Sequence, residues 1–471
     1  MTTLNFDCLI LIFDEIRTDK KSLYSCLFVN KKWCNIMVPI LWKHSLYKIS
    51  TLREEKIFNT ILSCLPLSSK QLLFDNNIKL PSTILLKPPL FNYISFCNFP
   101  ETEVIKKIIE MVLGNNNRYY QINLLEQEIY KLFVSQCKAI KELQWRTLQP
   151  LSLFPGALTC FSQLYSLFID IHSLNSNAIY EMAQICNNLN SLSIYNCSQD
   201  SPELISLIDA QKNLKRVYLY TIVKKGTCIE LCNALARKGN TINDLYFNSV
   251  GTIPPSFLTS LINLKWISLN TRDYEDDSEE IEELKQCLAI SEFPNLQILK
   301  IDGLSCFKEL AMLIEKTKGN LSHIDIYNID GDVAKNTKMF IKAIANNCPN
   351  LKLLFTFIEP KDFIHIKSLL INCKYLKALR LDSLDVDEND NIGDELLDIL
   401  TKFSPISLND IAISGGWKYS IDTFERFLES YRERSLHYFY LIYNVQYCIT
   451  ESHKIIISKY IDEGVIKYSF L

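Results

Sequence analysis

The chain has 471 residues, 48% of them hydrophobic, and its 50 Lys and Arg against 53 Asp and Glu leave a net charge of -3. A chain of this length exceeds one ordinary globular core, which indicates either several domains or a repeat array with an added module. The nearly balanced charge, without a basic block, gives no sign of a nucleic-acid partner or of an anionic membrane surface. No apolar run approaches the roughly 18 residues that a bilayer-spanning helix needs.

Residues 4–43 contain three apolar segments of helical period. The first includes Ile12 and Phe13, the second includes Leu23, and the third runs from Trp33 to Trp42. Pro39 interrupts the third segment, so we expect the chain to bend there rather than continue as one straight helix. The pattern predicts a small three-helix unit over residues 1–48.

The spacing within this unit resembles the F-box family. That family starts with Leu-Pro, continues with an acidic residue, an Ile-Phe pair and a Leu, and ends on Val-x-basic-basic-Trp and a closing Leu-Trp. The residues that fill these positions are Leu4, Asp7, Ile12, Phe13, Leu23, Val29, Lys31, Lys32, Trp33, Leu41 and Trp42. Asn5 stands where the family usually has proline, a residue suited to the start of a helix.

The resemblance implies that the unit binds a Skp-family adaptor, which in turn binds a cullin carrying the ubiquitin-transfer machinery. The residues implied to bind the adaptor are Leu4, Ile12, Phe13, Leu23, Val29, Trp33, Leu41 and Trp42. The alternative is a helical cap whose apolar faces are buried within the chain itself. That alternative accounts for the hydrophobic residues but not for the Val29 to Trp33 spacing beside the Leu-Trp ending.

Residues 49–135 are expected to form a helical connector. Helical patterns cover residues 51–65, 101–113 and 124–134, with prolines between the first two. The segment from Phe91 to Phe96 fits a short strand frame, so we expect degenerate repeats to begin here and to cap the array that follows.

From Ile140 to Leu441 one frame, apolar-x-x-apolar-x-apolar, recurs at steps of 22 to 32 residues, and most of the segments between its copies have helical period. Thr356 is the one non-apolar residue in the frame's apolar positions. The frames begin at Ile140, Leu164, Leu189, Leu214, Ile242, Leu264, Leu296, Leu321, Leu351, Leu376, Leu408 and Leu436. This is the strand signature of a leucine-rich repeat, and it predicts an α/β solenoid over residues 136–471 with a parallel concave sheet and outer helices. A helix at 455–461 and a strand at 465–470 are expected to close its carboxy-terminal end.

Two residue types accompany the frame. Asparagine directly precedes six of the twelve frames, and cysteine lies three residues before four of them. We expect the asparagines to adopt the left-handed conformation that ends a helix, as we expect of Gly239 and Gly319, and the cysteines to fill the core beneath that turn. All sixteen cysteines are expected to be reduced, because they lie in apolar helical contexts with no secretory signal before them.

The alternating residues of each frame are expected to point out of the concave side of the sheet. They are Gln144, Arg146, Phe168, Asp170, Tyr195, Arg216, Tyr218, Tyr220, Asp244, Tyr246, Trp266, Lys300, Asp302, His323, Asp325, Tyr327, Phe355, Phe357, Arg380, Asp382, Asp410, Tyr438 and Tyr440. Clustered Tyr, Trp and Arg are the residue types of binding hot spots, so Tyr195, Arg216, Tyr218, Tyr220, Tyr246 and Trp266 form the candidate substrate-binding site. The alternative is that tyrosine is present for its strand propensity and for ring packing.

Other chemical signals are weak. The acidic segment 385–398 lacks glycine at the sixth position of a calcium loop, and the acidic run 275–283 is expected to be a hydrated insertion. Cys228 and Cys232 lie one helical turn apart without further ligands nearby, which favours core packing over a metal site. With no catalytic or nucleotide-binding motif, we expect no enzyme activity and no cofactor.

The F-box and the repeats together resemble the large fungal group of F-box/leucine-rich-repeat proteins, a match that "LYSCLFVNKKWC" and "PPLFNYISFC" support. This architecture implies a cytoplasmic or nuclear substrate receptor of a Skp/cullin/F-box ubiquitin ligase, with an unknown target protein on the concave face. The alternative function is a protein-interaction scaffold with the same solenoid and no ligase role. A single sequence does not identify the target.

Overall fold

The computed structural model describes residues 6–16, 19–43, 51–84, 87–114, 118–221, 226–272, 278–328, 336–383, 392–415, 417–442 and 449–470. They belong to two compact units. The first comprises Met1–Leu192 and Pro202–Asn213, and the second comprises Ser193–Ser201 and Leu214–Leu471. The division falls within the repeats rather than between the repeats and the segments before them.

Three helices form the amino-terminal part of the first unit, as expected: α1 (Phe6–Glu15), α2 (Lys20–Cys26) and α3 (Lys31–Lys43). Asp19 caps α2, because its side chain accepts hydrogen bonds from the backbone N–H groups of Lys21 and Ser22. The core of the three helices consists of Leu9, Phe13, Leu23, Ile36 and Met37. Helix α3 continues through Pro39, the position at which we expected a bend.

The connector is helical, with α4 (Thr51–Ser63), α6 (Thr102–Leu113) and α7 (Tyr119–Gln136) where helices were expected, and with the additional helix α5 (Leu67–Asp75). The expected strand at residues 91–96 is wrong, since the 3-10 helix η1 (Tyr93–Phe96) lies there. The physical cause is local. The Asn92 side chain accepts a hydrogen bond from the Ser95 backbone N–H at 3.3 Å, which favours a tight helical turn over an extended chain.

The first unit also holds the first repeats. Strand β1 (Glu142–Trp145) pairs in parallel with β2 (Ser166–Asp170), and Glu142 lies beside Ser166. Helices α8 (Ala157–Phe161), α9 (Ser176–Ile185) and α10 (Pro202–Ala210) follow in chain order, and β3 (Ser191–Tyr195) contains the point where the two units divide.

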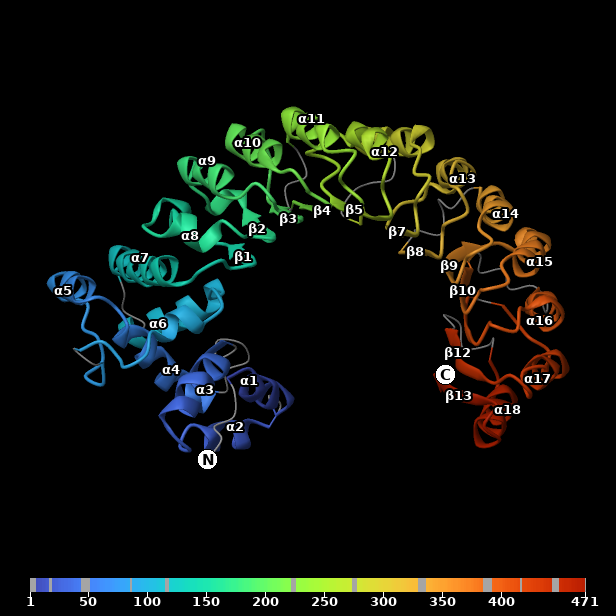
Figure 1. The fold of residues 1–471 in the computed structure, drawn as a ribbon. Helices are drawn as coiled ribbons and strands as arrows, with labels where there is room; N and C mark the ends of the chain where they lie inside the picture. Colours follow the sequence, from blue (N-terminus) through green and yellow to red (C-terminus); the bar gives the residue numbers. More distant parts are fainter. Residues whose placement is uncertain are drawn as a thin grey trace. The chain divides into compact units, whose positions relative to one another are not determined.

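The second unit repeats the same strand-and-helix module, with every neighbouring pair of strands from β4 to β13 parallel and in chain order. Figure 1 shows its strands along the inner side and its helices along the outer side. The strands are β4 (Arg216–Tyr220), β5 (Asp244–Asn248), β6 (Trp266–Asn270), β7 (Ile298–Asp302), β8 (His323–Tyr327), β9 (Leu353–Ile358), β10 (Ala378–Ser383), β11 (Asp410–Ser414), β12 (Leu436–Ile442) and β13 (Ile466–Phe470). The helices are α11 (Ile229–Arg237), α12 (Glu279–Ile290), α13 (Phe307–Glu315), α14 (Thr337–Asn347), α15 (Phe363–Asn372), α16 (Ile392–Phe403), α17 (Ile421–Glu429) and α18 (Glu451–Asp462).

These elements confirm the α/β leucine-rich-repeat solenoid. One of the strands β1 to β12 overlaps each of the twelve sequence frames, and most of the apolar positions of the frames are buried in the core. In the frame around β4, for example, Leu214, Val217 and Leu219 are at most 1% exposed. The shortest step of the repeat, between β5 and β6, has the 3-10 helix η4 (Pro255–Ser260) in place of an α-helix.

The asparagines before the frames do not have the expected left-handed conformation. Among the described non-glycine residues a positive φ occurs at other positions only, and of the two glycines Gly319 has a positive φ and Gly239 does not. Instead, asparagine side chains donate to the repeat before them. Asn213 donates to the Asn188 side chain at 2.6 Å, and a backbone carbonyl accepts from Asn263 at 2.9 Å, from Asn320 at 3.2 Å and from Asn350 at 3.0 Å. We call these bonds the asparagine ladder.

The cysteines before the frames are core residues, as expected. Cys137, Cys186, Cys348 and Cys373 are at most 2% exposed, and the Cys373 thiol donates to the Cys348 carbonyl at 3.3 Å. Burial raises the pKa of the Cys373 thiol to about 12, so it stays protonated and unreactive at neutral pH. The cysteines whose side chains the structure describes, from Cys26 to Cys373, are free thiols.

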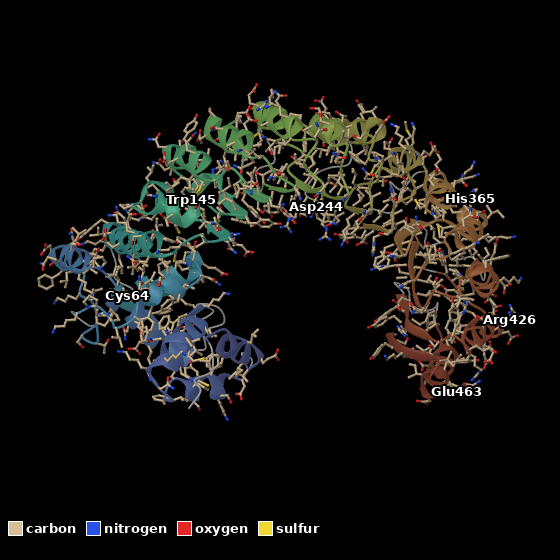
Figure 2. All side chains as sticks on the ribbon, viewed as in Figure 1. Cys64, Trp145, Asp244, His365, Arg426 and Glu463 are labelled. Atoms are coloured by element: carbon tan, nitrogen blue, oxygen red, sulfur yellow. The ribbon has the colours of Figure 1, made fainter. Side chains whose placement is uncertain are left out.

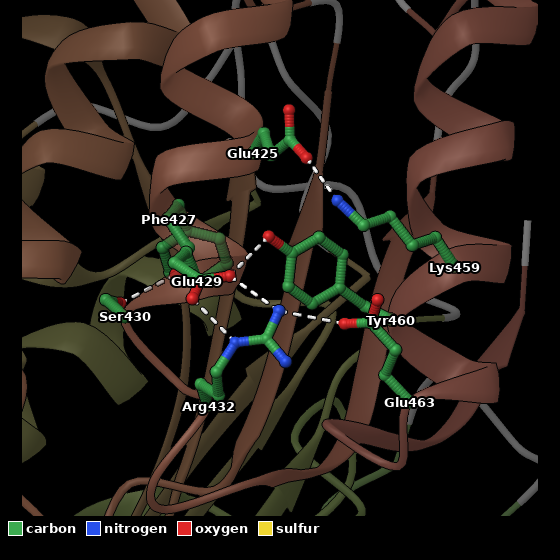
Figure 3. Close-up of polar contacts among 8 residues, drawn as sticks. All are labelled: Glu425, Phe427, Glu429, Ser430, Arg432, Lys459, Tyr460 and Glu463. Atoms are coloured by element: carbon green, nitrogen blue, oxygen red, sulfur yellow. Dashed lines mark hydrogen bonds and ion pairs between the residues drawn. The ribbon is translucent and has the colours of Figure 1, made fainter.

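Helices α17 and α18 and strand β13 end the second unit, where a helix and a strand were expected. A polar network joins the two helices (Figure 3). Arg432 donates to Glu429 at 2.6 and 2.8 Å and to Glu463 at 2.8 Å, while the Tyr460 hydroxyl donates to Glu429 at 2.7 Å. These bonds fix the last repeat to the one before it.

Candidate functional sites

The residues that the F-box resemblance implies as adaptor contacts differ in how far their side chains are exposed on the three helices. Ile12 and Val29 are 43% and 55% exposed, whereas Phe13 and Leu23 are buried in the core. Trp33, Leu41 and Trp42 are half-buried, and Leu4 lies outside the described residues. Ring contacts hold the two tryptophans: Trp33 packs edge-on against Phe13 at 5.1 Å, and Trp42 lies 4.6 Å from Tyr93 of the connector.

Further exposed apolar residues on the same helices were not among the expected contacts. Phe28 is 88% exposed, Leu11 is 66% exposed and Tyr24 is 45% exposed. Phe28 and Val29 lie together in the turn between α2 and α3, and Leu11 and Ile12 lie together on α1. Position alone could have identified Phe28, because it follows the helix that ends at Cys26 and so lies outside the helical core stripe.

The concave face is the side of the sheet in the second unit that faces away from the helices. Figure 2 shows Asp244 on this side and His365 and Arg426 on the helical side. The strand register arranges the concave residues in rows that cross the strands. The first row consists of Arg216, Asp244, Trp266, Ile298 and His323. The second row consists of Tyr218, Tyr246, Ser268, Lys300, Asp325, Phe355 and Arg380. The third row includes Tyr220 and Asn248 on β4 and β5, and Asn270, Asp302 and Tyr327 on β6 to β8.

Four of the expected tyrosines meet in one hollow, which we call the tyrosine cradle. Tyr195, Tyr218, Tyr220 and Tyr246, with Ser193, line a volume of about 340 Å³. The rings of Tyr195 and Tyr220 are 4.9 Å apart, and all four side chains are half-buried. Burial raises the pKa of Tyr246, so its hydroxyl keeps its proton and can donate a hydrogen bond.

The other two expected site residues adjoin the cradle without lining it. Trp266 contacts the Tyr218 ring at 6.3 Å, and Arg216 lies beside Asp244 in the register. The structure therefore brings together an aromatic surface with an adjacent charged pair. Partly buried aromatic rings with hydroxyl groups at the edge are suited to holding a protein segment, because they combine apolar area with hydrogen bonding at low entropic cost.

A second hollow of about 430 Å³ lies further along the concave face, over β8 to β10. It is lined by Asp325, Ile326, Tyr327, Asn328, Phe355, Phe357, Arg380 and Asp382. Its carboxylates, guanidinium group and aromatic rings make it chemically different from the tyrosine cradle, which contains no charged residue. We call it the charged hollow.

The structure brings no described residues together as a metal site: no group of three or more His, Cys, Asp or Glu within these ranges could hold an ion. Cys228 and Cys232 are buried, and Cys228 lies 3.7 Å from the Cys197 sulfur. Two acidic segments lie partly outside the described ranges: residues 385–391 of the segment compared with a calcium loop, and residues 275–277 of the acidic run. Of the helices that the structure describes, none is long and apolar enough to cross a membrane.

By its elements and surfaces the chain is a leucine-rich-repeat solenoid with a helical amino-terminal part. No family model matches its sequence, and no curated protein matches it either. Among solved structures, the crystal structure of the Rad7 and Elc1 complex in yeast is similar at 14% identity, with 96% of each chain covered and a TM-score of 0.42.

Two further solved structures are similar over about two thirds of this chain. The leucine-rich-repeat-containing protein LegL7 from Legionella pneumophila is 14% identical, with 68% of this chain and 97% of that chain covered and a TM-score of 0.32. A chain of the Toll–Spatzle complex from Drosophila is 12% identical, with 67% and 52% covered and a TM-score of 0.27.

Proposed function

We propose that this chain is the substrate-recognition subunit of a Skp/cullin/F-box ubiquitin ligase in the cytoplasm or nucleus. In this proposal α1 to α3 bind a Skp-family adaptor, and through it a cullin, while the concave face holds a target protein. The observation that carries the proposal is the set of exposed apolar side chains on α1 to α3.

These side chains are costly to leave in water. A three-helix segment of about 40 residues has little apolar surface to spare, and this one already uses Leu9, Phe13 and Met37 for its own core. It nevertheless exposes Phe28 and Leu11 beside the two sequence-implied contacts Ile12 and Val29. Contiguous exposed apolar residues on a small helical unit are typical of a protein-binding surface.

The chain itself would perform no chemistry in this role. A target held on the concave face comes within reach of a ubiquitin-conjugating enzyme bound elsewhere in the assembly, so the rate increase comes from proximity. This division of work fits a chain whose described residues form aromatic and charged hollows on the concave face.

A protein-interaction scaffold without ligase function is the second candidate. The observation in its favour is the burial of Phe13 and Leu23, two of the eight implied adaptor contacts, inside the helical unit. A helical cap needs those residues buried. It does not need Ile12, Phe28 and Val29 to be exposed.

Co-purification of the full chain with a Skp-family adaptor separates the two candidates. We expect wild type to bind the adaptor and the double variant Ile12→Ala, Val29→Ala to lose binding by tenfold or more, since hot-spot residues contribute about 2 kcal/mol each. The matched control is Leu67→Ala, Phe74→Ala, which removes two residues of the connector that are 64% and 66% exposed. No binding by wild type, or equal binding by both double variants, would contradict the receptor proposal.

A further inference from the structure

The concave face of β7 to β10 contains three pairs of a carboxylate and an aromatic ring on neighbouring strands. Asp302 of β7 lies in register with Tyr327 of β8. Asp325 of β8 lies in register with Phe355 of β9, and Phe357 of β9 with Asp382 of β10. The carboxylate is on the earlier strand in the first two pairs and on the later strand in the third.

The first and third pairs each hold a guanidinium group of the chain itself. Arg272 lies with its Nε 2.5 Å from the Asp302 carboxylate and its guanidinium 5.6 Å from the Tyr327 ring centre. Asn328 also donates to Asp302, at 2.8 Å. In the third pair, the Nε and Nη2 of Arg380 lie 3.1 and 3.0 Å from the two oxygens of Asp382. Both carboxylates are thus compensated by short, charge-assisted hydrogen bonds.

The middle pair differs. Asp325 accepts no hydrogen bond from any residue in the described ranges, and the described cation nearest to it is Lys300, at 3.9 Å. That separation is too long for a hydrogen bond, and the Lys300 side chain is 42% exposed, so the contact is a weak surface ion pair. Burial raises the pKa of Asp325 against the effect of Lys300 and Arg380, in keeping with a carboxylate that has lost water without gaining donors.

Asp325 lines the charged hollow together with aromatic side chains. Tyr327, Phe355 and Phe357 surround the same space of about 430 Å³. An aromatic face attracts a cation, and a nearby carboxylate adds the opposite charge. Arg380, the one cation among the described lining residues, is already engaged by Asp382. Asp325 therefore keeps only its weak ion pair with Lys300, which lies outside the lining, and can accept hydrogen bonds from a further cation.

We propose that the charged hollow binds a lysine or arginine side chain of the target protein, with Asp325 as its counter-ion and Phe355 as its aromatic neighbour. Arg272, which lies against both Asp302 and the Tyr327 ring, shows how a carboxylate and a ring on this face hold a guanidinium group. This inference rests on the proposed role of the concave face in target binding and names the chemistry of the target. It does not depend on the adaptor, because the hollow lies in the second unit and the adaptor surface in the first.

The test uses the full-length protein and a random twelve-residue peptide library displayed on phage. Selected clones should be enriched in Lys or Arg, and a synthetic copy of the best clone should bind with measurable affinity by calorimetry. Asp325→Asn should weaken that peptide by about tenfold or more, because an ionic hydrogen bond is lost. Asp410→Asn is the matched control, since it removes a half-buried carboxylate of the same face on β11, outside the hollow.

Lys300 provides a variant with the opposite expected sign. Lys300→Met removes the cation that competes for Asp325, so the same peptide should bind up to about fivefold more tightly. A purely structural role of the Lys300–Asp325 contact would weaken binding in both variants. Thermal unfolding of each variant checks that the second unit stays folded.

Three results would overturn the proposal. They are a library without Lys or Arg enrichment, clones that bind Asp325→Asn as well as wild type, and clones enriched in Asp or Glu that depend on Arg380. The adaptor co-purification changes residues of the first unit, whereas the peptide experiment changes residues of the second. A negative result in one experiment therefore leaves the result of the other interpretable.

Discussion

Phe13→Ala should unfold the three-helix part of the chain while the repeats stay folded. Phe13 is fully buried, and its ring packs edge-on against Trp33 at 5.1 Å in a core with Leu9, Leu23 and Met37. Removing a buried phenyl ring costs about 3 to 5 kcal/mol, from lost transfer free energy and from the cavity left behind. A single core of this size supplies only about 3 to 5 kcal/mol of stability in total. The substitution should therefore remove nearly all of it.

Hydrogen–deuterium exchange of the full chain, read by mass spectrometry, measures this directly. Peptides from α1 to α3 should lose their slow-exchanging amides in Phe13→Ala, whereas peptides from α13 and α14 should keep theirs, because repeats contact their neighbours only. Ile12→Ala is the control. Its side chain is 43% exposed, so the change in the free energy of unfolding should stay below about 1 kcal/mol.

Unchanged protection of α1 to α3 in Phe13→Ala would refute the reasoning, since it would mean that these helices derive their stability from outside the five-residue core. The result also decides how adaptor binding is tested. A Phe13 variant that loses adaptor binding because its helices unfold does not show whether Phe13 contacts the adaptor. Ile12 and Val29 are exposed, so their substitution tests the contact itself.

Three further predictions concern the repeats. Gln211→Ala should lower the free energy of unfolding of the first unit, measured in urea, by about 2 kcal/mol. The buried Gln211 side chain accepts from the Leu189 N–H at 2.9 Å and donates to the Cys186 and Leu207 carbonyls at 2.9 and 2.8 Å. A loss below about 0.5 kcal/mol would contradict this reasoning. Hydrogen bonds from Arg432 and then Tyr460 lower the pKa of Glu429 from 4.5 to about 2. Its stabilising effect is therefore complete above pH 4.5 and lost as the pH falls toward 2, so thermal melts of Glu429→Gln should vary less with pH in that window, and an unchanged acid slope would argue against the network. Finally, the triple variant Tyr218→Ala, Tyr246→Ala, Trp266→Ala should lose its co-purifying target proteins in quantitative mass spectrometry with an unchanged circular dichroism spectrum; retained targets would place the site elsewhere on the chain.

The strands could be predicted from the sequence because one physical requirement repeats in every module. Each strand must bury the same side, and the frame that contains Leu214, Val217 and Leu219 records that requirement directly. Helix α5 was missed for the opposite reason. Its apolar residues Leu67, Leu72 and Phe74 are exposed, so they do not form a stripe of helical period that marks a buried face.

The candidate sites could be predicted only in part. Alternation along a strand places Tyr218 and Tyr246 on the concave face, and the sheet brings them side by side in the tyrosine cradle. The special position of Asp325 could not be predicted, because it depends on the register between strands and on which carboxylate each arginine reaches. The asparagines before the frames bond through their side chains to the preceding repeat, so their enrichment does not come from the left-handed conformation that we expected.

The asparagine ladder gives the array a direction. In the bonds from Asn320 and Asn350, each asparagine donates backward to a carbonyl near the corresponding point of the previous repeat. A module that carries both the donor and the acceptor can be duplicated in tandem without leaving either group unmatched, because the new copy bonds backward to its parent and accepts from the repeat that follows. The ladder thus allows the array to lengthen by tandem duplication of a module, because the match of donor and acceptor is kept at each new junction.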